Sequence, residues 1–372
     1  MAPASRSREI LLDLRCLQGP SAKRGIGTYA RGLTQALSGL SFEYSVLLDA
    51  ELGEVELPKT VSTVHRVRRR SHGRLASYED AVALAADLDR IRPALYHALT
   101  PTLPSRSPCP VAVTVHDMIP WAFGGWRMFG ERVRNRVARR LIPKAELIFA
   151  VSNSTRDDLL RIGGADESRI RVVYEGVGPE FKPQADAAAR VQRRWSLEGP
   201  YLLFVGALDV RKDPHGLIRA WRTVTASGIS AQLVLAGDPG PQAPADMGGA
   251  LRLGHVSTEE LVDLLGAAGC LLYPSLYEGF GLPALEAMAC GCPVVAYRNS
   301  SLPEVMGGAG ILVPNLDSDA LGRAAVELLS DPARRSALVK VGLRQASQFT
   351  WARAARGTID GYRAIVDIIS AA

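Results

Sequence analysis

Short runs of apolar residues alternate with longer amphipathic segments along most of the chain. The short runs are rich in leucine and β-branched residues, a composition that predicts buried strands. We expect strands in the first half near residues 10–14, 44–48, 95–97, 111–115, 147–151 and 171–174, and in the second half near 201–205, 232–236, 270–273, 294–296 and 311–313.

The amphipathic segments between these runs predict helices. Examples lie near residues 27–37, 215–224, 258–265 and 284–289, and the segments 320–329 and 332–348 predict closing helices. A regular alternation of strand and helix is typical of an α/β protein whose parallel sheets carry helices on their faces.

The length of 372 residues exceeds what one hydrophobic core ordinarily serves, so it predicts two domains. A polar segment that begins with Pro179-Glu-Phe-Lys-Pro183 separates the two series of strands. We therefore expect domains over residues 1–183 and 184–349. Each should bind ligands at the carboxyl ends of its strands.

The composition, 47% hydrophobic and 22% charged, is that of a globular protein. No run approaches the ~20 apolar residues that span a bilayer, and the segment before residue 10 lacks the apolar core of a signal peptide. A cytoplasmic enzyme is expected. The five cysteines are scattered, and the pair Cys290 and Cys292, without further ligands nearby, predicts buried small residues rather than a metal site.

The formal net charge is +6, and much of the excess lies in two arginine clusters. The first cluster is Arg66, Arg68, Arg69, Arg70 and Arg74, and the second is Arg132, Arg134, Arg136, Arg139 and Arg140. Such clusters either attract an anionic partner or form a solvated surface.

The second cluster has a pattern of its own. Its arginines lie largely opposite a helical face of Val133, Val137, Leu141 and Ile142, and aromatic or apolar residues precede it at Trp121, Phe123, Trp126, Met128 and Phe129. Two interpretations stay open: peripheral contact with an anionic membrane at its inner face, or a surface helix docked on its own sheet.

The densest motif runs from Ser275 to Val295, after a predicted strand and into a predicted helix. Gly279 and Gly281 let the backbone approach a ligand, and the start of the helix offers unpaired N–H groups. Glu278 in the loop and Glu286 in the helix can each accept hydrogen bonds from paired hydroxyls. The motif predicts a site for phosphate and for sugar rings.

A second motif, Phe204-Val-Gly206-Ala-Leu-Asp-Val-Arg211-Lys212, places two adjacent cations after a strand. Arginine offers a planar fork to phosphate oxygens, and lysine offers a compact charge. The pair can neutralise a diphosphate without a metal ion. We expect Arg211 and Lys212 to meet the same ligand as the two glutamates.

These motifs resemble those of the retaining glycosyltransferases of family 4, which have the GT-B fold, and the resemblance covers nearly the whole chain. The matching residues of the second half are Gly206, Arg211-Lys212, Ala236-Gly237, Gly254-His255-Val256, the segment from Glu278 to Glu286, and Gly291-Cys-Pro-Val-Val. The resemblance implies an α/β fold with two Rossmann-like, doubly wound parallel sheets that face a central cleft. It also implies that the C-terminal helix, near 350–372, joins the N-terminal acceptor-binding domain.

The family's roles can be carried over to the matching positions. By resemblance, Arg211 and Lys212 bind the donor diphosphate, and Glu286 binds the ribose. Glu278 holds the sugar ring, Val256 frames the base, and the remaining donor contacts come from Gly206 and from the backbone of Gly279, Phe280, Gly281 and Leu282.

The first half matches the family through shorter motifs. Arg24-Gly-Ile-Gly27-Thr-Tyr resembles the glycine-rich loop beside the donor phosphates, which assigns Gly27 to the donor site. Thr114-Val-His116-Asp117 resembles the motif whose histidine approaches the transferred sugar, so His116 is expected to be catalytic. Tyr174-Glu-Gly-Val-Gly178 also fits the family's pattern.

The resemblance implies transfer of a hexose from a nucleotide-sugar, with GDP-mannose favoured over a UDP-sugar, to a hydroxyl of a glycan, lipid-linked or small-molecule acceptor. Retention of configuration is implied, and neither a metal, a cofactor nor nucleic acid is expected. A nucleotide-sugar epimerase of the same fold and a non-catalytic protein that binds sugar nucleotides are alternatives.

Two further patterns resemble motifs of other kinds of site, one for a dinucleotide and one for a metal ion. Gly25-Ile-Gly27-Thr-Tyr-Ala30 fits a dinucleotide-binding fingerprint, but it lies too far beyond the strand at 10–14 for the tight turn that this fingerprint needs. Asp87-Leu-Asp89 and Asp317-Ser-Asp319 resemble metal-binding pairs. The first falls within a helical segment, and the second opens a helix, where aspartate commonly caps.

Overall fold

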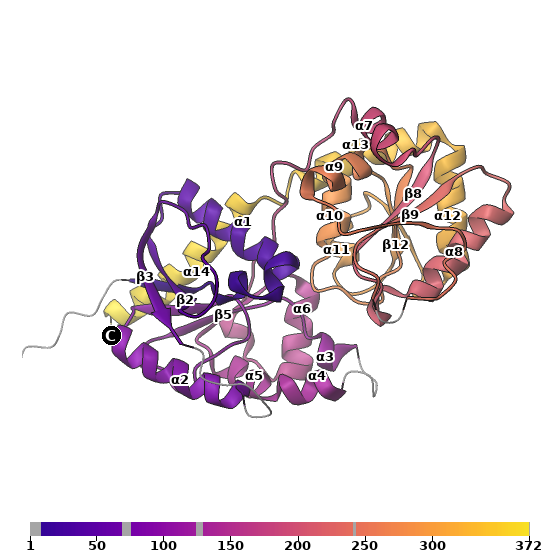
Figure 1. Cartoon of the computed structure of the whole chain (residues 1–372). Helices are drawn as coiled ribbons and strands as arrows, with labels where there is room; N and C mark the ends of the chain where they lie inside the picture. The colour runs from indigo at the N-terminus through magenta and orange to yellow at the C-terminus, as the bar shows by residue number, and fades with distance from the viewer. Residues whose placement is uncertain (1–8, 69–75, 124–128, 241–242, 372) are drawn as a thin grey trace, which may run out of the picture. The chain divides into compact units, whose positions relative to one another are not determined.

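The computed structural model describes residues 9–68, 76–123, 129–240 and 243–371. The chain divides into two compact units (Figure 1). The first unit comprises Met1–Gly176 and Thr350–Ala372, and the second comprises Val177–Phe349.

The boundary between the units lies at residue 176 rather than at the expected residue 183. Residues 177–183 belong to the second unit because their contacts lie there. The Val177 N–H donates to the Phe349 carbonyl oxygen at 3.1 Å, and Pro183 lies against Gly291.

The first unit contains a seven-stranded sheet in the order β3-β2-β1-β4-β5-β6-β7, with all neighbours parallel. The reversal of strand order beside β1 makes the sheet doubly wound. Its strands are β1 (Ile10–Asp13), β2 (Tyr44–Asp49), β3 (Val61–Val67), β4 (Leu95–Ala98), β5 (Val111–Val115), β6 (Leu147–Ala150) and β7 (Ile170–Val172).

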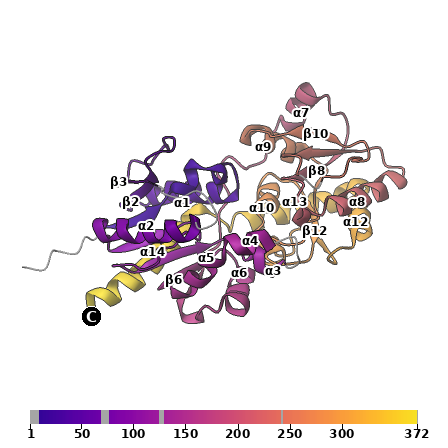
Figure 2. The ribbon, with the colours of Figure 1, turned by 60° about the horizontal axis from the view of Figure 1, so that its bottom comes forward.

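Helices cover both faces of this sheet (Figures 1 and 2). On one face lie α1 (Gly25–Gly39) and the C-terminal α14 (Trp351–Ala371), and on the other lie α2 (Ala76–Ile91) and α5 (Arg136–Leu141). Leu84 and Leu88 of α2 pack with Tyr96 and Val113 in one core layer. The shorter helices are α3 (Ile119–Ala122), α4 (Phe129–Arg134) and α6 (Asn153–Asp158).

The second unit contains a six-stranded parallel sheet in the order β10-β9-β8-β11-β12-β13, which repeats the same winding. Its strands are β8 (Tyr201–Val205), β9 (Gln232–Ala236), β10 (Leu251–Gly254), β11 (Cys270–Tyr273), β12 (Val294–Tyr297) and β13 (Ile311–Val313).

Helices also flank this second sheet on both sides (Figure 1). On one side, Trp221 of α8 (Pro214–Ala226) and Leu328 of α12 (Ser318–Ser330) pack on Phe204 and Leu272. The other helices are α7 (Ala187–Trp195), α9 (Thr258–Ala267), α10 (Leu282–Ala289), α11 (Leu302–Met306) and α13 (Pro332–Ala346). Across the described ranges, no helix is both long and apolar enough to cross a bilayer.

Two strands, β3 and β10, were not expected. Both stand at an edge of their sheet, so one side of each strand is unpaired, and all of their residues except Val67 are at least partly exposed. The apolar run that marks a buried parallel strand is therefore weak in both.

The packing of α14 on α1 yields a test of how the C-terminal helix is held. A side-chain carbon at Gly32 of α1 would overlap the Trp351 indole, so Gly32→Ala should lower the free energy of unfolding of the first unit by about 1–3 kcal/mol. Urea unfolding of the full chain measures this change. Gly39→Ala in the same helix is the control, because nothing lies within 4 Å of the added carbon. Equal stability of the two variants would contradict the packing.

Candidate donor site

The site begins where β8 ends. Gly206 follows β8 with φ +126°, a conformation that favours glycine, and the Lys212 side chain lies beside it, with Cε 3.6 Å from where a side-chain carbon would stand. Asp209 caps the short 3-10 turn Val210–Lys212 by accepting the Lys212 N–H at 3.2 Å. This turn directs both cations towards the carboxyl end of the sheet.

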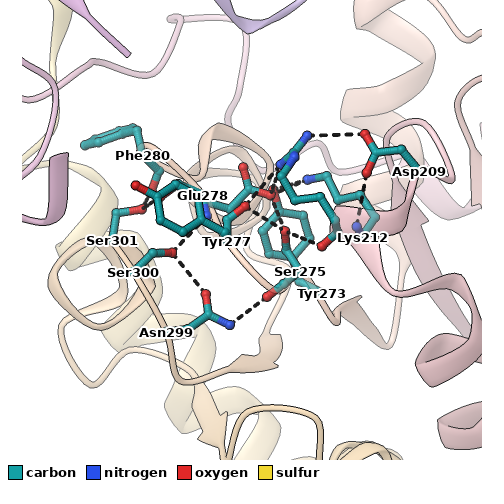
Figure 3. A network of polar contacts seen from close by, with 11 residues as sticks. Asp209, Lys212, Tyr273, Ser275, Tyr277, Glu278, Phe280, Asn299, Ser300 and Ser301 are labelled. Carbon is teal, nitrogen blue, oxygen red and sulfur yellow. Dashed lines mark hydrogen bonds and ion pairs between the residues drawn. The ribbon is translucent and has the colours of Figure 1, made fainter. Parts of the chain in front are cut away.

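A single oxygen of the Glu278 carboxylate contacts both cations (Figure 3). Its Oε1 accepts hydrogen bonds from Arg211 Nη1 at 2.8 Å and from Lys212 Nζ at 2.6 Å. The Tyr273 hydroxyl donates to the same oxygen at 2.9 Å, and the Ser275 hydroxyl also donates to it. All four contacts use Oε1, so the second carboxylate oxygen takes part in none of them.

Charge is strongly stabilised in this cluster. Burial alone raises the pKa of Glu278, but Arg211 and Lys212 outweigh it and bring that pKa down to about 2. Burial lowers the pKa of Lys212, and the Glu278 carboxylate opposes this effect. The Glu278 pKa is depressed in the folded state, so its contribution to stability is present above its ordinary value near 4.5. That contribution is lost as the pH falls towards 2.

The loop that follows β12 holds the loop that carries Glu278 in place (Figure 3). Asn299 Nδ2 donates to the Ser275 carbonyl oxygen at 2.8 Å, the Ser300 hydroxyl accepts the Glu278 N–H at 2.8 Å, and the Ser301 hydroxyl donates to the Phe280 carbonyl oxygen at 2.7 Å. These three residues were not singled out from the sequence. Their signal was a polar triplet directly after a predicted strand.

The other residues that were expected at the donor site lie along the loop and the start of α10. Gly281 precedes α10 with φ +103°. The Phe280 ring is buried edge-on against Phe349 at 5.8 Å, so only its backbone faces the loop. Gly279 lies between Glu278 and Phe280, and Leu282 begins the helix.

Glu286 and Val256 complete the expected set. Glu286 is half-buried within α10, and its charge helps to raise the pKa of Tyr273, after burial and Glu278. Val256 is half-buried just beyond β10. The second unit thus brings Arg211, Lys212 and Glu278 into direct contact and leaves Glu286 within electrostatic range.

His116, the expected catalytic residue of the first unit, follows β5 and has both ring nitrogens engaged. Nδ1 lies 3.1 Å from Glu175 Oε1, and Nε2 lies 3.1 Å from the Leu99 carbonyl oxygen. The Tyr29 ring packs edge-on at 4.8 Å. Both partners are acceptors, so the arrangement suits an imidazolium with two N–H groups. Burial lowers the pKa of His116, but Glu175 outweighs burial and raises it.

Gly27 lies in the first turn of α1, where a side-chain carbon would overlap the Ala22 backbone. This close packing explains on structural grounds why a glycine stands at position 27. Two 3-10 turns, Arg15–Gln18 and Pro20–Lys23, separate β1 from α1, so the tight turn of a dinucleotide fingerprint is missing.

Comparisons with known proteins agree on one family. Residues 23–181 match the family described as Glycosyltransferase Family 4, and residues 199–331 match the one described as Glycosyl transferases group 1. Together the two matches cover most of the chain.

The chain thus combines a Glycosyltransferase Family 4 domain with a Glycosyl transferases group 1 domain.

Its similar relatives include the O-antigen chain mannosyltransferase B of Escherichia coli, 32% identical over 60% of this chain and 61% of that protein. The serotype-specific mannosyltransferase WbdA of Escherichia coli is 25% identical over 95% of this chain and 48% of that protein. A D-inositol 3-phosphate glycosyltransferase of Kineococcus radiotolerans is 33% identical over 61% of this chain and 59% of that protein. The matches therefore span less than two thirds of these relatives' length.

Solved structures confirm the GT-B fold. Sucrose-phosphate synthase from Thermosynechococcus elongatus superposes with a TM-score of 0.79 at 23% identity, over 98% of this chain and all of that one. WaaG, a glycosyltransferase involved in lipopolysaccharide biosynthesis, gives 0.76 at 15% identity over 94% of this chain and 98% of that one.

The residues that resemble metal-binding pairs have other partners in the structure. Asp87 pairs with Arg90, and Asp89 pairs with Arg106. Asp317 caps α12 by accepting the Ala320 N–H at 2.8 Å. Cys290 and Cys292 are buried and carry free thiols. Within the described residues, no three His, Cys, Asp or Glu side chains gather as metal ligands would.

Several arginines of the two clusters make local contacts. Arg66 pairs with Glu54 and Arg68 with Glu51, whereas Arg69, Arg70 and Arg74 lie outside the described residues. Arg139 donates to the Ile162 carbonyl oxygen, and its guanidinium lies 5.9 Å from the Trp121 ring centroid.

The single amphipathic helix expected over the second cluster is wrong. The segment is divided at Asn135 into two short helices, α4 and α5. Val133 is 45% exposed, whereas Ala138 and Ile142 are buried in the core of the first unit. Docking on its own sheet therefore describes α5. Trp126 and Met128 lie outside the described residues.

The His116 environment yields a prediction about pH. Glu175→Gln removes the carboxylate that favours the imidazolium, so the His116 pKa should fall towards or below its ordinary 6.5. Nitrogen-15 NMR of the imidazole across pH reports this shift. A raised folded-state pKa gives stability that is fully present below pH 6.5 and lost as pH rises through the folded value, so the variant should be less stable mainly on the acidic side.

The control for this experiment is Glu167→Gln, which removes an exposed carboxylate from the same unit. It should leave the His116 titration in place. An unshifted His116 pKa in Glu175→Gln would show that the pair does not set the charge.

Proposed function

We propose that this protein transfers a hexosyl group from a nucleotide-sugar to an acceptor hydroxyl, with retention of anomeric configuration and without a metal ion. The supporting observation is the joint contact of Arg211 and Lys212 with the buried carboxylate of Glu278. Such an arrangement suits a sugar diphosphate, because cations for the phosphates and a fixed acceptor for hydroxyls stand side by side.

The reaction breaks the anomeric C–O bond of the donor through an oxocarbenium-like state. The departing diphosphate gains negative charge, which Arg211, Lys212 and the N–H groups at the start of α10 stabilise. The Arg211 side chain is 23% exposed and can present its fork to an incoming phosphate. The acceptor oxygen attacks on the face that the diphosphate leaves and gives its proton to the departing phosphate oxygen, which accounts for retention.

The first unit is proposed to bind the acceptor, and His116 stays assigned to the transferred sugar. With its two ring nitrogens engaged, His116 acts by its positive charge rather than as a proton acceptor. Gly27 likewise stays assigned to the donor phosphates.

GDP-mannose is the favoured donor, and a UDP-sugar is next. Two of the relatives are named as mannosyltransferases, and a structural neighbour from Anabaena was solved with UDP and glucose. The acceptor is a glycan, a lipid-linked sugar or a small molecule. A cytoplasmic location with peripheral contact to an anionic membrane stays a prediction.

Lys212→Ala tests the proposed chemistry. It removes a cation that stabilises the leaving diphosphate, so turnover should fall by on the order of 10²-fold or more. The assay follows release of GDP or UDP and formation of a glycosylated acceptor. Lys340→Ala is the control, because Lys340 lies exposed on α13 of the same unit.

The same assay separates the alternatives. Conversion of the donor sugar without an acceptor would indicate an epimerase, and binding without turnover would indicate a non-catalytic protein. Turnover near that of the unmodified protein in Lys212→Ala would refute the role of the lysine.

Metal independence yields a separate test. Because the diphosphate charge is met by side-chain cations, transfer should continue at an unchanged rate in excess chelator. The rate is measured before and after dialysis against chelator and again after addition of manganese. Loss of activity that manganese restores would contradict the proposal.

A further inference from the structure

Tyr273 is a buried residue that the proposed chemistry has not yet used. It ends β11, a strand in the interior of the second sheet, and its side chain is 0% exposed. Its hydroxyl reaches the carboxyl end of the sheet, where the loop that carries Glu278 begins (Figure 3).

The Tyr273 hydroxyl lies between the Lys212 ammonium and the Glu278 carboxylate. Its oxygen accepts a hydrogen bond from Lys212 Nζ at 2.6 Å, and its single proton goes to Glu278 Oε1 at 2.9 Å. These roles are fixed by chemistry, because an ammonium can only donate and an ionised carboxylate can only accept. The ammonium also lies 4.2 Å from the centroid of the Tyr273 ring, within the range of a cation–π contact.

The contacts orient the ammonium completely. Lys212 carries three N–H groups, of which one points to Glu278 and one to Tyr273. The direction of the third N–H is then set by tetrahedral geometry. A buried lysine held only by the carboxylate could rotate about that one bond.

We propose that Tyr273 is a positioning residue that aims the Lys212 ammonium at the donor diphosphate, an inference that rests on the proposed function. The charged groups that act on Lys212 are Glu278, Arg211 and Asp209. Tyr273 adds a neutral acceptor to this set. It stabilises the ammonium without neutralising it, so the charge remains for the phosphates.

The test is Tyr273→Phe, which keeps the ring and removes only the hydroxyl. We expect kcat/KM for the donor to fall about tenfold or more, the range for loss of a hydrogen bond to a charged group. The loss of activity at alkaline pH should begin at a lower pH than in the unmodified protein, because the ammonium has lost an acceptor. Calorimetric titration with GDP and with UDP should show weaker binding.

The matched control is Tyr201→Phe. Tyr201 is buried in the same unit, and its hydroxyl donates to the Leu264 carbonyl oxygen at 2.5 Å, away from the cations. It should lose stability but keep both kcat/KM and the alkaline limb. An unmoved alkaline limb in Tyr273→Phe, whatever the change in kcat/KM, would assign Tyr273 a purely structural role and overturn the inference.

Two further measurements keep the inference testable. The nitrogen-15 resonance of Lys212 Nζ titrates without any assay of turnover, and in Tyr273→Phe it should titrate at lower pH. If Tyr273→Phe does not fold, 3-fluorotyrosine placed at position 273 keeps the shape and weakens the phenol as an acceptor, so it should move the alkaline limb in the same direction. No shift would again overturn the inference.

Failure of the proposed function has a different signature. In that case the unmodified protein binds neither GDP nor UDP and transfers no sugar, whereas the Lys212 resonance still reports on Tyr273. A protein that transfers sugar equally well with tyrosine or phenylalanine at 273 retains the function and loses only this inference.

Discussion

The contact of two cations with one buried carboxylate oxygen is the interaction on which the proposed donor site depends. Removing one partner of a buried ion pair costs roughly 3–5 kcal/mol, because the remaining charge is left without compensation. Arg211, Lys212 and Glu278 therefore stabilise one another as a set. The set is built from the ends of β8 and β11, which are adjacent strands of one parallel sheet. The topology thus delivers residues distant in sequence to the same point.

Most of the fold was predictable where burial dictates the sequence. Interior strands such as β5 and β11 are buried along their whole length, and their sequences are largely apolar. The edge strands β3 and β10 were missed because backbone pairing on one side, rather than apolar content, defines them. The break at Asn135 was also missed, since the helical periodicity continues across it in the sequence.

The residues of the site also divide into those that the sequence predicted and those that it did not. Glu278, Arg211 and Lys212 were identified because their motifs are dense in glycine and charge. Tyr273 was hidden inside a strand, where a tyrosine resembles any other core residue. The Asn299 to Ser301 loop was hidden for another reason: its contacts cross from β12 to the neighbouring loop, and no local pattern records them. Glu175 lay within a noted motif, but its pairing with His116 depends on the fold.

The way in which the chain is divided between its two units has an evolutionary consequence. The second unit is one uninterrupted stretch, and its first and last residues meet through the bond from the Val177 N–H to the Phe349 carbonyl oxygen. On the other side of the junction, Gly176 packs so closely on Trp351 that a side-chain carbon would not fit. A segment whose ends lie together can be exchanged as a cassette without stretching the host fold. Recombination at these two neighbouring points could therefore exchange the second unit, and with it the residues proposed to bind the donor, while the first unit is kept.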